Sequence, residues 1–219
     1  TSLGANLPPA RYNHTAVWTG TEMIVWAGNP YSTAMTTGGR YLPASDAWLP
    51  MTSGPNVPSA RSGHSAVWTG AEMIVWGGPV APDVTGGRYA PATDTWTPTS
   101  TTGTPEARGG HAAVWTGSRM VVWGGSGSSG ELSSGGRYDP VTDTWQPTST
   151  GSNVPAARRG VEAVWTGSRM LVWDGYPTTG TGGRYDPATD TWQAISTASA
   201  PSPRWGYSSV WTGSHMVVW

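Results

Sequence analysis

The stretches AVWTGSRMVVW, residues 113–123, and GGRYDPVTDTW, residues 135–145, together decide the fold. Near copies of the first lie at residues 16–26, 66–76, 163–173 and 209–219, and near copies of the second lie at residues 38–48, 86–96 and 182–192. The Trp of the shared VWTG segment therefore recurs every 46 to 50 residues. Self-similarity at such a period is typical of architectures built from stacked, equivalent units.

Each period favours β-strands. The segments around AVW and MVVW are short and rich in Val, Ile and Trp, and the Thr-Gly between them is a tight-turn signal. The segments GGRY and TDTW form a second pair, joined by Pro and Asp, which are common turn residues. No stretch shows a helical period, and Gly and Pro recur too often for helices. Four strands, A to D in chain order, in about 50 residues describe one blade of a β-propeller.

The motifs resemble the kelch repeat. A Gly-Gly doublet follows a strand (Gly77-Gly78, Gly124-Gly125), then comes a Tyr (Tyr89, Tyr138), and a Trp follows seven residues later (Trp96, Trp145). A leading Pro-x-Ala-Arg-x-x-His, at residues 58–64 and 105–111, is also similar to kelch sequences.

The resemblance covers nearly the whole chain. It implies an all-β kelch-type β-propeller of four-stranded antiparallel blades, in one domain over residues 1–219. We expect blades at about 9–48, 58–96, 105–145 and 155–192, and the A–B hairpin of a fifth at 201–219. Because neither end supplies the missing strands, we expect the chain to be part of a larger ring of about six or seven blades.

The composition limits the function classes. The formal charge is −1, so charge favours neither nucleic acid nor an anionic membrane as a partner. The chain has no cysteine, which excludes disulfides, thiol catalysis and cysteine-ligated metals within it. No apolar run approaches the length of a membrane span, so we expect no membrane insertion.

Loop lengths point to one face. The A-strand Trp and the B-strand Trp are always eight residues apart, and the C-strand Tyr and the D-strand Trp are always seven apart. The B–C connection varies instead, with 15, 13, 15 and 12 residues from Trp to Tyr, and the D–A connection varies slightly. B–C and D–A connections emerge at the same end of an up-and-down blade. Since recognition is usually built on variable loops, we expect ligands at that face.

Residues that recur in every blade favour structural roles. The Trp rows are expected to pack between blades rather than stack on sugars. The Arg set is expected to bond to backbone rather than form an anion-binding ring, and the Asp set to stabilise turns. Three His recur at one position of the repeat, but each belongs to a separate blade, so we expect no metal site and no cofactor. The recurring residues are Arg11, Arg61, Arg108, Arg158 and Arg204, then His14, His64 and His111, then Asp46, Asp94, Asp143 and Asp190.

Positions that break the repeat are better candidates for function, because symmetry does not explain them. The fourth repeat reads RGVEA where the second reads SGHSA, and the fifth reads WGYSS. Asp174 replaces the first Gly of the doublet, and the B–C loops add further aromatic and acidic residues. Drift in a tolerant surface is the alternative interpretation. The candidate ligand-binding residues are Tyr12, Tyr31, Arg159, Glu162, Asp174, Tyr176, Trp205 and Tyr207.

The leading hypothesis is a non-catalytic binding or scaffolding propeller for a protein or glycan, with self-association as a further option. The alternative is a sugar-processing enzyme similar to the sialic-acid mutarotases, which are also kelch propellers, with Arg159, Glu162 and Tyr207 as possible acid/base groups. Copper chemistry like that of galactose oxidase needs a cysteine and is excluded. Similarity to secreted kelch proteins of bacteria favours an extracellular or periplasmic location.

Overall fold

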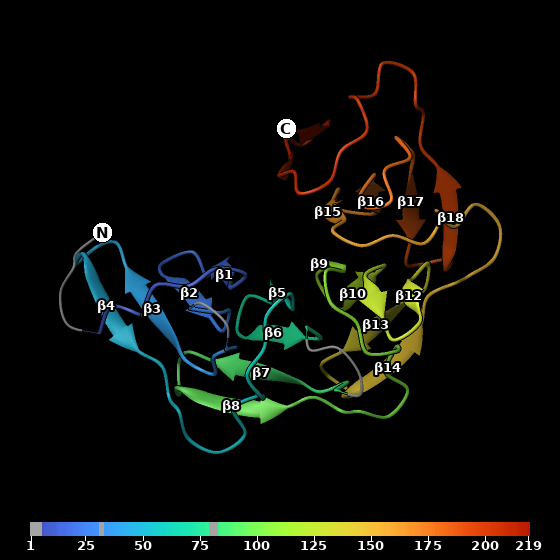
Figure 1. Ribbon diagram of the computed structural model, residues 1–219. Coiled ribbons are helices and arrows are strands. Elements are labelled where there is room, and N and C mark those ends of the chain that lie inside the picture. Colours follow the sequence, from blue (N-terminus) through green and yellow to red (C-terminus); the bar gives the residue numbers. More distant parts are fainter. Residues whose placement is uncertain (1–5, 31–32, 79–82) are drawn as a thin grey trace.

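The chain forms four sheets of four antiparallel strands, followed by a two-stranded hairpin (Figure 1). The computed structural model describes residues 6–30, 33–78 and 83–219. The predicted all-β architecture of four-stranded antiparallel blades is confirmed, since every regular element in the described residues is a strand. No helix in this part of the chain has the length and apolar character that crossing a membrane requires.

The first two blades follow the predicted strand order. The first comprises β1 (Thr15–Trp18), β2 (Met23–Trp26), β3 (Gly38–Leu42) and β4 (Ala47–Pro50). The second comprises β5 (Ser65–Trp68), β6 (Met73–Trp76), β7 (Gly86–Ala90) and β8 (Thr95–Pro98).

The later blades repeat this plan with one addition. The third comprises β9 (Ala112–Trp115), β10 (Met120–Trp123), β13 (Gly135–Asp139) and β14 (Thr144–Pro147). Its B–C loop forms a small extra pair that the sequence did not predict, β11 (Ser126–Gly127) and β12 (Gly130–Glu131). The fourth comprises β15 (Glu162–Trp165), β16 (Met170–Trp173), β17 (Gly182–Asp186) and β18 (Thr191–Ala194). The final hairpin comprises β19 (Ser209–Trp211) and β20 (Met216–Val218).

The blades follow one another along an arc, with their A strands innermost (Figure 1). Each A strand contacts the A strand of the next blade, from β1 through β5, β9 and β15 to β19. Because neighbouring strands in each blade are antiparallel and lie in the order A-B-C-D, the A–B and C–D turns lie at one end of the strands, and the B–C and D–A connections at the other.

The Thr-Gly of each VWTG segment builds the A–B turn. In the third blade the Thr116 hydroxyl accepts a hydrogen bond from the backbone N–H of Arg119 at 3.0 Å, and the Thr116 N–H donates to the Arg119 carbonyl at 2.9 Å. Gly117 has a φ of 96°, a conformation that favours glycine. This local chemistry explains why the turn length never varies.

The Gly-Gly of each GGRY segment allows close packing of strand C. A Cβ on Gly135 would collide with the carbonyl oxygen of Val122 on strand B, and one on Gly136 would collide with the Pro105 ring. The two Gly residues at the start of strand C are therefore a steric requirement of the blade.

The core consists of three clusters, one at each junction between consecutive blades. Between the first two blades, Ile24 and Trp26 of β2 pack against Met73, Tyr89 and Trp96 of the second blade. Equivalent residues fill the junctions between the second and third and between the third and fourth blades. Packing of the Trp rows between blades is thus confirmed for the B and D strands.

The A-strand Trp depends on having a neighbour. Trp68, Trp115 and Trp165 pack at the edges of the three clusters. Trp18, their equivalent in the first blade, is 54% exposed, since no blade in the described residues packs on that side.

The recurring Asp residues stabilise the C–D turns, as predicted. Asp94 adopts a φ of 51°, and its Oδ1 accepts a hydrogen bond from the Tyr89 hydroxyl at 2.6 Å. The same oxygen accepts the backbone N–H of Thr52 at 2.9 Å, which ties the turn to the connection leaving the first blade. Burial raises the pKa of Tyr89, so its hydroxyl keeps the proton that it donates.

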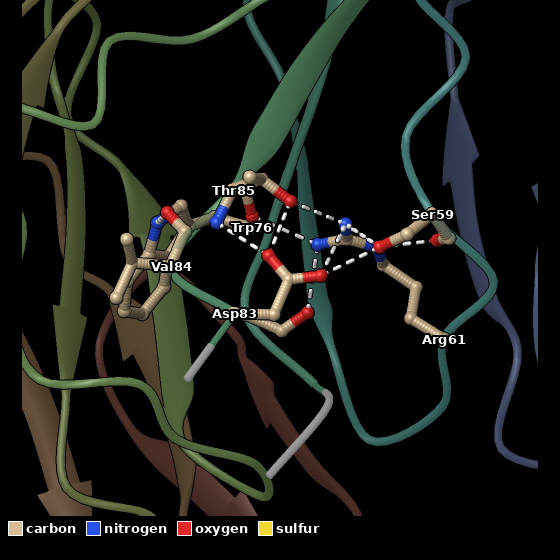
Figure 2. A network of polar contacts seen from close by, with 7 residues as sticks. Ser59, Arg61, Trp76, Asp83, Val84 and Thr85 are labelled. Atoms are coloured by element: carbon tan, nitrogen blue, oxygen red, sulfur yellow. Dashed lines mark hydrogen bonds and ion pairs between the residues drawn. The ribbon is translucent and has the colours of Figure 1, made fainter. Parts of the chain in front are cut away.

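The recurring Arg residues bond to backbone, also as predicted (Figure 2). Arg61 is buried and donates to the carbonyls of Ser59, Gly77 and Thr85 at 3.0, 3.0 and 2.8 Å. Arg108 and Arg158 repeat this pattern in the next two blades. Each guanidinium thus holds the B–C loop against the D–A segment of its own blade.

The His residues bridge neighbouring blades. His64 Nε2 lies 2.8 Å from the Thr15 hydroxyl, and His111 Nε2 lies 2.7 Å from the Ser65 hydroxyl. The next junction replaces this polar pair with an apolar one, Val161 against Ala112. Burial lowers the pKa of both His64 and His111 to about 3, with a further contribution from the nearby Arg61 and Arg108, respectively.

Candidate functional site

The B–C loop and the D–A segment of a blade lie side by side at the face that the loop lengths indicated. Single antiparallel bridges join Tyr12 to Asn29, Gly109 to Ser126 and Arg159 to Tyr176. In the fourth blade the bridge is closed by two hydrogen bonds of 2.8 Å, Arg159 N–H to Tyr176 O and Tyr176 N–H to Arg159 O. In the first, third and fourth blades, the residue two positions before the His position of the repeat therefore sits beside its own B–C loop.

The inner Gly residues form a backbone ladder around the centre of the arc. Gly110 N–H donates to Gly63 O at 2.9 Å, and Gly160 N–H donates to Gly110 O at 2.8 Å. All three have φ between 58° and 67°, a conformation suited to Gly. The sequence interpretation overlooked this ladder, although the signal was present in the Gly that precedes the His position of the repeat.

Three of the predicted residues come together in the fourth and fifth repeats. Arg159, Tyr176 and Trp205 line a hollow of about 330 Å³, whose floor includes Gly110 and Gly160. The Arg159 guanidinium carbon lies 4.5 Å from the centre of the Tyr176 ring, and the rings of Tyr176 and Trp205 meet edge to face at 6.5 Å. We call these three residues the rim cluster.

The rim cluster is accessible to a partner. Trp205 is 65% exposed and Tyr176 is 45% exposed, in contrast to the buried Trp of the blade junctions. Such large exposed aromatic side chains beside an Arg are the residue types that dominate protein interfaces.

The third blade supplies the counter-charge. Arg159 Nη1 lies 2.5 Å from Glu131 Oε1, and Glu131 belongs to the unpredicted strand β12. The ion pair and the Tyr176 ring together hold the guanidinium over the hollow.

Asp174 lies beneath the rim cluster rather than in it. The residue is fully buried, and its carboxylate accepts the N–H of Thr179 at 2.7 Å, the N–H of Gly180 at 3.0 Å and the N–H of Arg204. These bonds join the loop that carries Tyr176 to the segment that carries Trp205. Asp174 is therefore a positioning residue for both rings. In the sequence it had stood out because it replaces the first Gly of the doublet that follows strand B.

Tyr207 and Glu162 belong to the junction between the fourth blade and the final hairpin. The buried Tyr207 hydroxyl donates to the Trp173 carbonyl and accepts the Glu162 N–H at 3.2 Å. Burial raises the pKa of Tyr207 to about 12 and also raises the pKa of Glu162, whose side chain keeps an exposed edge. Tyr207 thus occupies the repeat position of His64 and His111 and plays a similar bridging part.

The two remaining candidates lie elsewhere. Tyr12 is 48% exposed and occupies the position of Arg159 in the first blade, at the opposite end of the arc of complete blades. Tyr31 falls outside the described residues.

The side chains available for metal binding are dispersed. In residues 6–30, 33–78 and 83–219, no group of three His, Asp or Glu gathers in a way that could hold a metal ion. His64 and His111 bond to hydroxyl groups of the preceding blade.

Comparison with known proteins agrees with the geometry. A family model described as the KLHDC2/KLHL20/DRC7 Kelch-repeats domain matches residues 41–219. No curated protein matches the chain. The match spans more than half of the sequence and includes the second to fourth blades and the final hairpin, so the chain belongs to the kelch-repeat family.

Proposed function

We propose that this chain is a non-catalytic binding module that holds a protein partner at the B–C/D–A face, with the rim cluster as its anchor. Kelch-repeat domains generally mediate protein binding and scaffolding. The observation that carries the proposal is the exposed Arg159–Tyr176–Trp205 cluster around its hollow.

The surroundings of the cluster support binding rather than turnover. Arg159 is paired with Glu131, and Tyr207 is buried with its hydroxyl bonded to backbone, so neither presents a free acid or base to the hollow. The aromatic faces supply contact area at low entropy cost, because each ring has few rotatable bonds. The ladder of Gly residues and the Asp174 contacts hold the floor and the loops in place before a partner arrives.

The test is a selection of peptides from a random display library on the immobilised protein. For peptides selected on wild type, we expect Trp205→Ala to weaken binding about 30-fold, the loss typical of an interface hot spot. Val141→Ser is the matched control, because Val141 is 90% exposed in the C–D turn at the other end of the strands. Equal binding to wild type and Trp205→Ala would refute the proposal.

A second variant tests how the rim cluster is positioned. Asp174→Gly restores the Gly found at this position in the second and third blades and suits the φ of 45°. We expect weaker peptide binding together with faster amide hydrogen exchange at Thr179, Gly180 and Arg204. Unchanged exchange at those amides would contradict the positioning role.

We also propose that the partner is met outside the cytoplasm, in an extracellular or periplasmic setting. The absence of cysteine is compatible with this location, since no thiol is exposed to oxidation. A glycan array run beside the peptide selection tests whether the same face takes carbohydrate instead. Detection of the protein solely in the cytoplasmic fraction of its source cells would contradict the location.

A further inference from the structure

Strand C of each of the four blades carries an Arg, and the blades differ in what surrounds its guanidinium group. In the first blade Arg40 donates two hydrogen bonds to Glu22, from Nε to Oε2 and from Nη2 to Oε1, both at 3.0 Å. In the second blade Glu72 Oε2 lies 3.9 Å from Arg88 Nη1. In both blades, therefore, a carboxylate from the residue before strand B accompanies this Arg.

The third blade lacks this carboxylate, because Arg119 stands where the first two blades have Glu. The strand C residue, Arg137, reaches instead towards the fourth blade. Its Nη1 donates to the Pro187 carbonyl at 3.4 Å, and its Nη2 lies 3.5 Å from Asp190 Oδ2. Arg137 Nε is left buried, with no hydrogen-bond acceptor among the described residues.

Arg119 and Arg137 line one hollow of about 330 Å³. The other lining residues are polar as well, namely Asp139, Thr142, Thr144 and Gln146. Within residues 6–30, 33–78 and 83–219 the Arg119 side chain makes no hydrogen bond, and its Nε lies 3.6 Å from Asp139 Oδ2. Two guanidinium groups with unused donors thus belong to the wall of a wholly polar hollow.

The hollow lies at the end of the strands opposite to the rim cluster. Arg119 stands in the A–B turn, immediately before β10, and Thr142 stands in the C–D turn between β13 and β14. The rim cluster belongs to the B–C and D–A connections at the other end. A ligand in this hollow therefore approaches a different face, and the site does not rest on the proposed function.

We propose that this hollow binds a sugar acid, that is, a small molecule with several hydroxyl groups and a single carboxylate, such as a uronate. The carboxylate lies between the guanidinium groups of Arg119 and Arg137 and takes the part that Glu22 plays in the first blade. Hydrogen bonds between charged groups of this kind are about twice as strong as neutral ones. The ligand thus supplies the acceptor that the third blade lacks.

The remaining lining selects a hydroxylated ligand with one charge. The hydroxyl groups of Thr142 and Thr144, 2.8 Å apart, and the amide of Gln146 both donate and accept hydrogen bonds. A hydrocarbon acid would cover these groups without bonding to them, which costs binding energy. Asp139 accepts bonds from ligand hydroxyl groups but repels a second negative charge, so a monocarboxylate fits better than a phosphate or a dicarboxylate.

The first test compares ligands on the unaltered protein. D-Glucuronate, D-glucose and a glutamate capped at both ends are each titrated into the ¹⁵N-labelled whole chain at constant ionic strength, and the Arg Nε–H signals are followed by NMR. We expect glucuronate to shift the signals of Arg119 and Arg137 with a Kd of about 1 mM. We expect glucose, which lacks the carboxylate, and capped glutamate, which lacks the hydroxyl groups, to bind at least tenfold more weakly.

A double variant fills the hollow from within. Arg119→Glu/Asp139→Ala gives the third blade the residues of the second, Glu72 and Ala90. The new carboxylate lies beside the strand C Arg and occupies the place of the ligand. We expect glucuronate to bind at least tenfold more weakly to this variant.

The fourth blade offers the matched control. Arg169→Glu/Asp186→Ala makes the same change there, in a blade where Gln193 Oε1 already accepts the Arg184 Nε–H at 2.8 Å. We expect this variant to bind glucuronate like wild type. Trp205→Ala is likewise expected to leave the binding unchanged, which separates this site from the rim cluster.

Three outcomes would overturn the proposal. The first is an equal response of the Arg119 and Arg137 signals to glucuronate and glucose, including no response to either. The second is equal affinity for capped glutamate, which would assign the hollow to an acidic side chain of a protein instead. The third is an equal effect of the two double variants on glucuronate binding.

Discussion

Single residues show how a polar side chain is buried at the junction between two blades. His111 lies against the hydroxyl of Ser65 in the preceding blade and is held neutral by burial, which lowers its pKa to about 3. The next junction reaches the same packing with Val161 and Ala112, with no titratable group. The protein thus carries its own apolar replacement for a buried His–Ser pair.

This comparison predicts a pH dependence. Because the folded-state pKa of His111 lies below its ordinary value of 6.5, the unfolded chain binds more protons between these two values. The stability contribution is therefore present above pH 6.5 and is lost as the pH falls towards 3. Between pH 7 and pH 5 one such His lowers the free energy of unfolding by about 2 kcal/mol.

The measurement is urea denaturation at both pH values. We expect the Ser65→Ala/His111→Val double variant, which copies the Ala112–Val161 pair of the next junction, to lose about 2 kcal/mol less than wild type between pH 7 and pH 5. His64, whose pKa is lowered by burial and by the nearby Arg61, His111 and His14, remains in both proteins, so most of its own loss cancels in the comparison. An identical loss in both proteins would contradict the assignment.

At the scale of single elements, the ion pair between strand C and the residue before strand B has opposite charges in the first two blades and the next two. In the first two blades a Glu just before strand B pairs with the Arg of strand C, Glu22 with Arg40 at 3.0 Å and Glu72 with Arg88 at 3.9 Å. In the next two blades an Arg stands at that position and pairs with an Asp that follows the strand C Tyr. These pairs are Arg119–Asp139 at 3.6 Å and Arg169–Asp186 at 3.1 Å.

The exchange predicts a rescue. Glu72→Arg places a second cation beside Arg88, and we expect a loss of about 1 kcal/mol in the free energy of unfolding. Adding Ala90→Asp recreates the pairing of the third and fourth blades, since Ala90 holds the position of Asp139. We expect the double variant to recover most of the loss. Thermal denaturation of the single and the double variant at low and high salt measures the loss of stability and its recovery. A double variant that is no more stable than Glu72→Arg alone would contradict the pairing.

The candidate site was predictable to the extent that it broke the repeat. Arg159, Tyr176 and Trp205 stood out as departures from an otherwise regular pattern, and the structure brings them around one hollow. Tyr207 and Asp174 stood out equally, yet they serve the junction and the loops. A departure from the repeat does not by itself distinguish an exposed binding residue from a buried structural one. A substitution that fills a blade junction breaks the repeat as much as a substitution on the surface does.

The whole molecule is stabilised by junctions rather than by one central core. The three apolar clusters lie between consecutive blades and share no residue. Stability in such a chain is approximately a sum of blade and nearest-neighbour terms.

This organisation predicts that damage stays local. Trp123→Ala removes a fully buried side chain from the junction between the third and fourth blades, with an expected cost of about 3 to 5 kcal/mol. Native-state hydrogen exchange should show lost protection in β10, β16 and β17 and retained protection in β2 and β3. Uniform loss across all strands would show instead that the chain opens as a single unit.

The sequence by itself determined the strands, the turns and the kelch repeat of the blades. These features depend on contacts within one period, such as the Thr116 turn, the Tyr89–Asp94 bond and the Gly135-Gly136 packing, and are written anew in each repeat. Tertiary structure alone decided which side chains meet at the rim cluster. These side-chain contacts depend on the rotation between blades and on backbone hydrogen bonds between loops distant in sequence. The periodicity of residue types does not encode either of them.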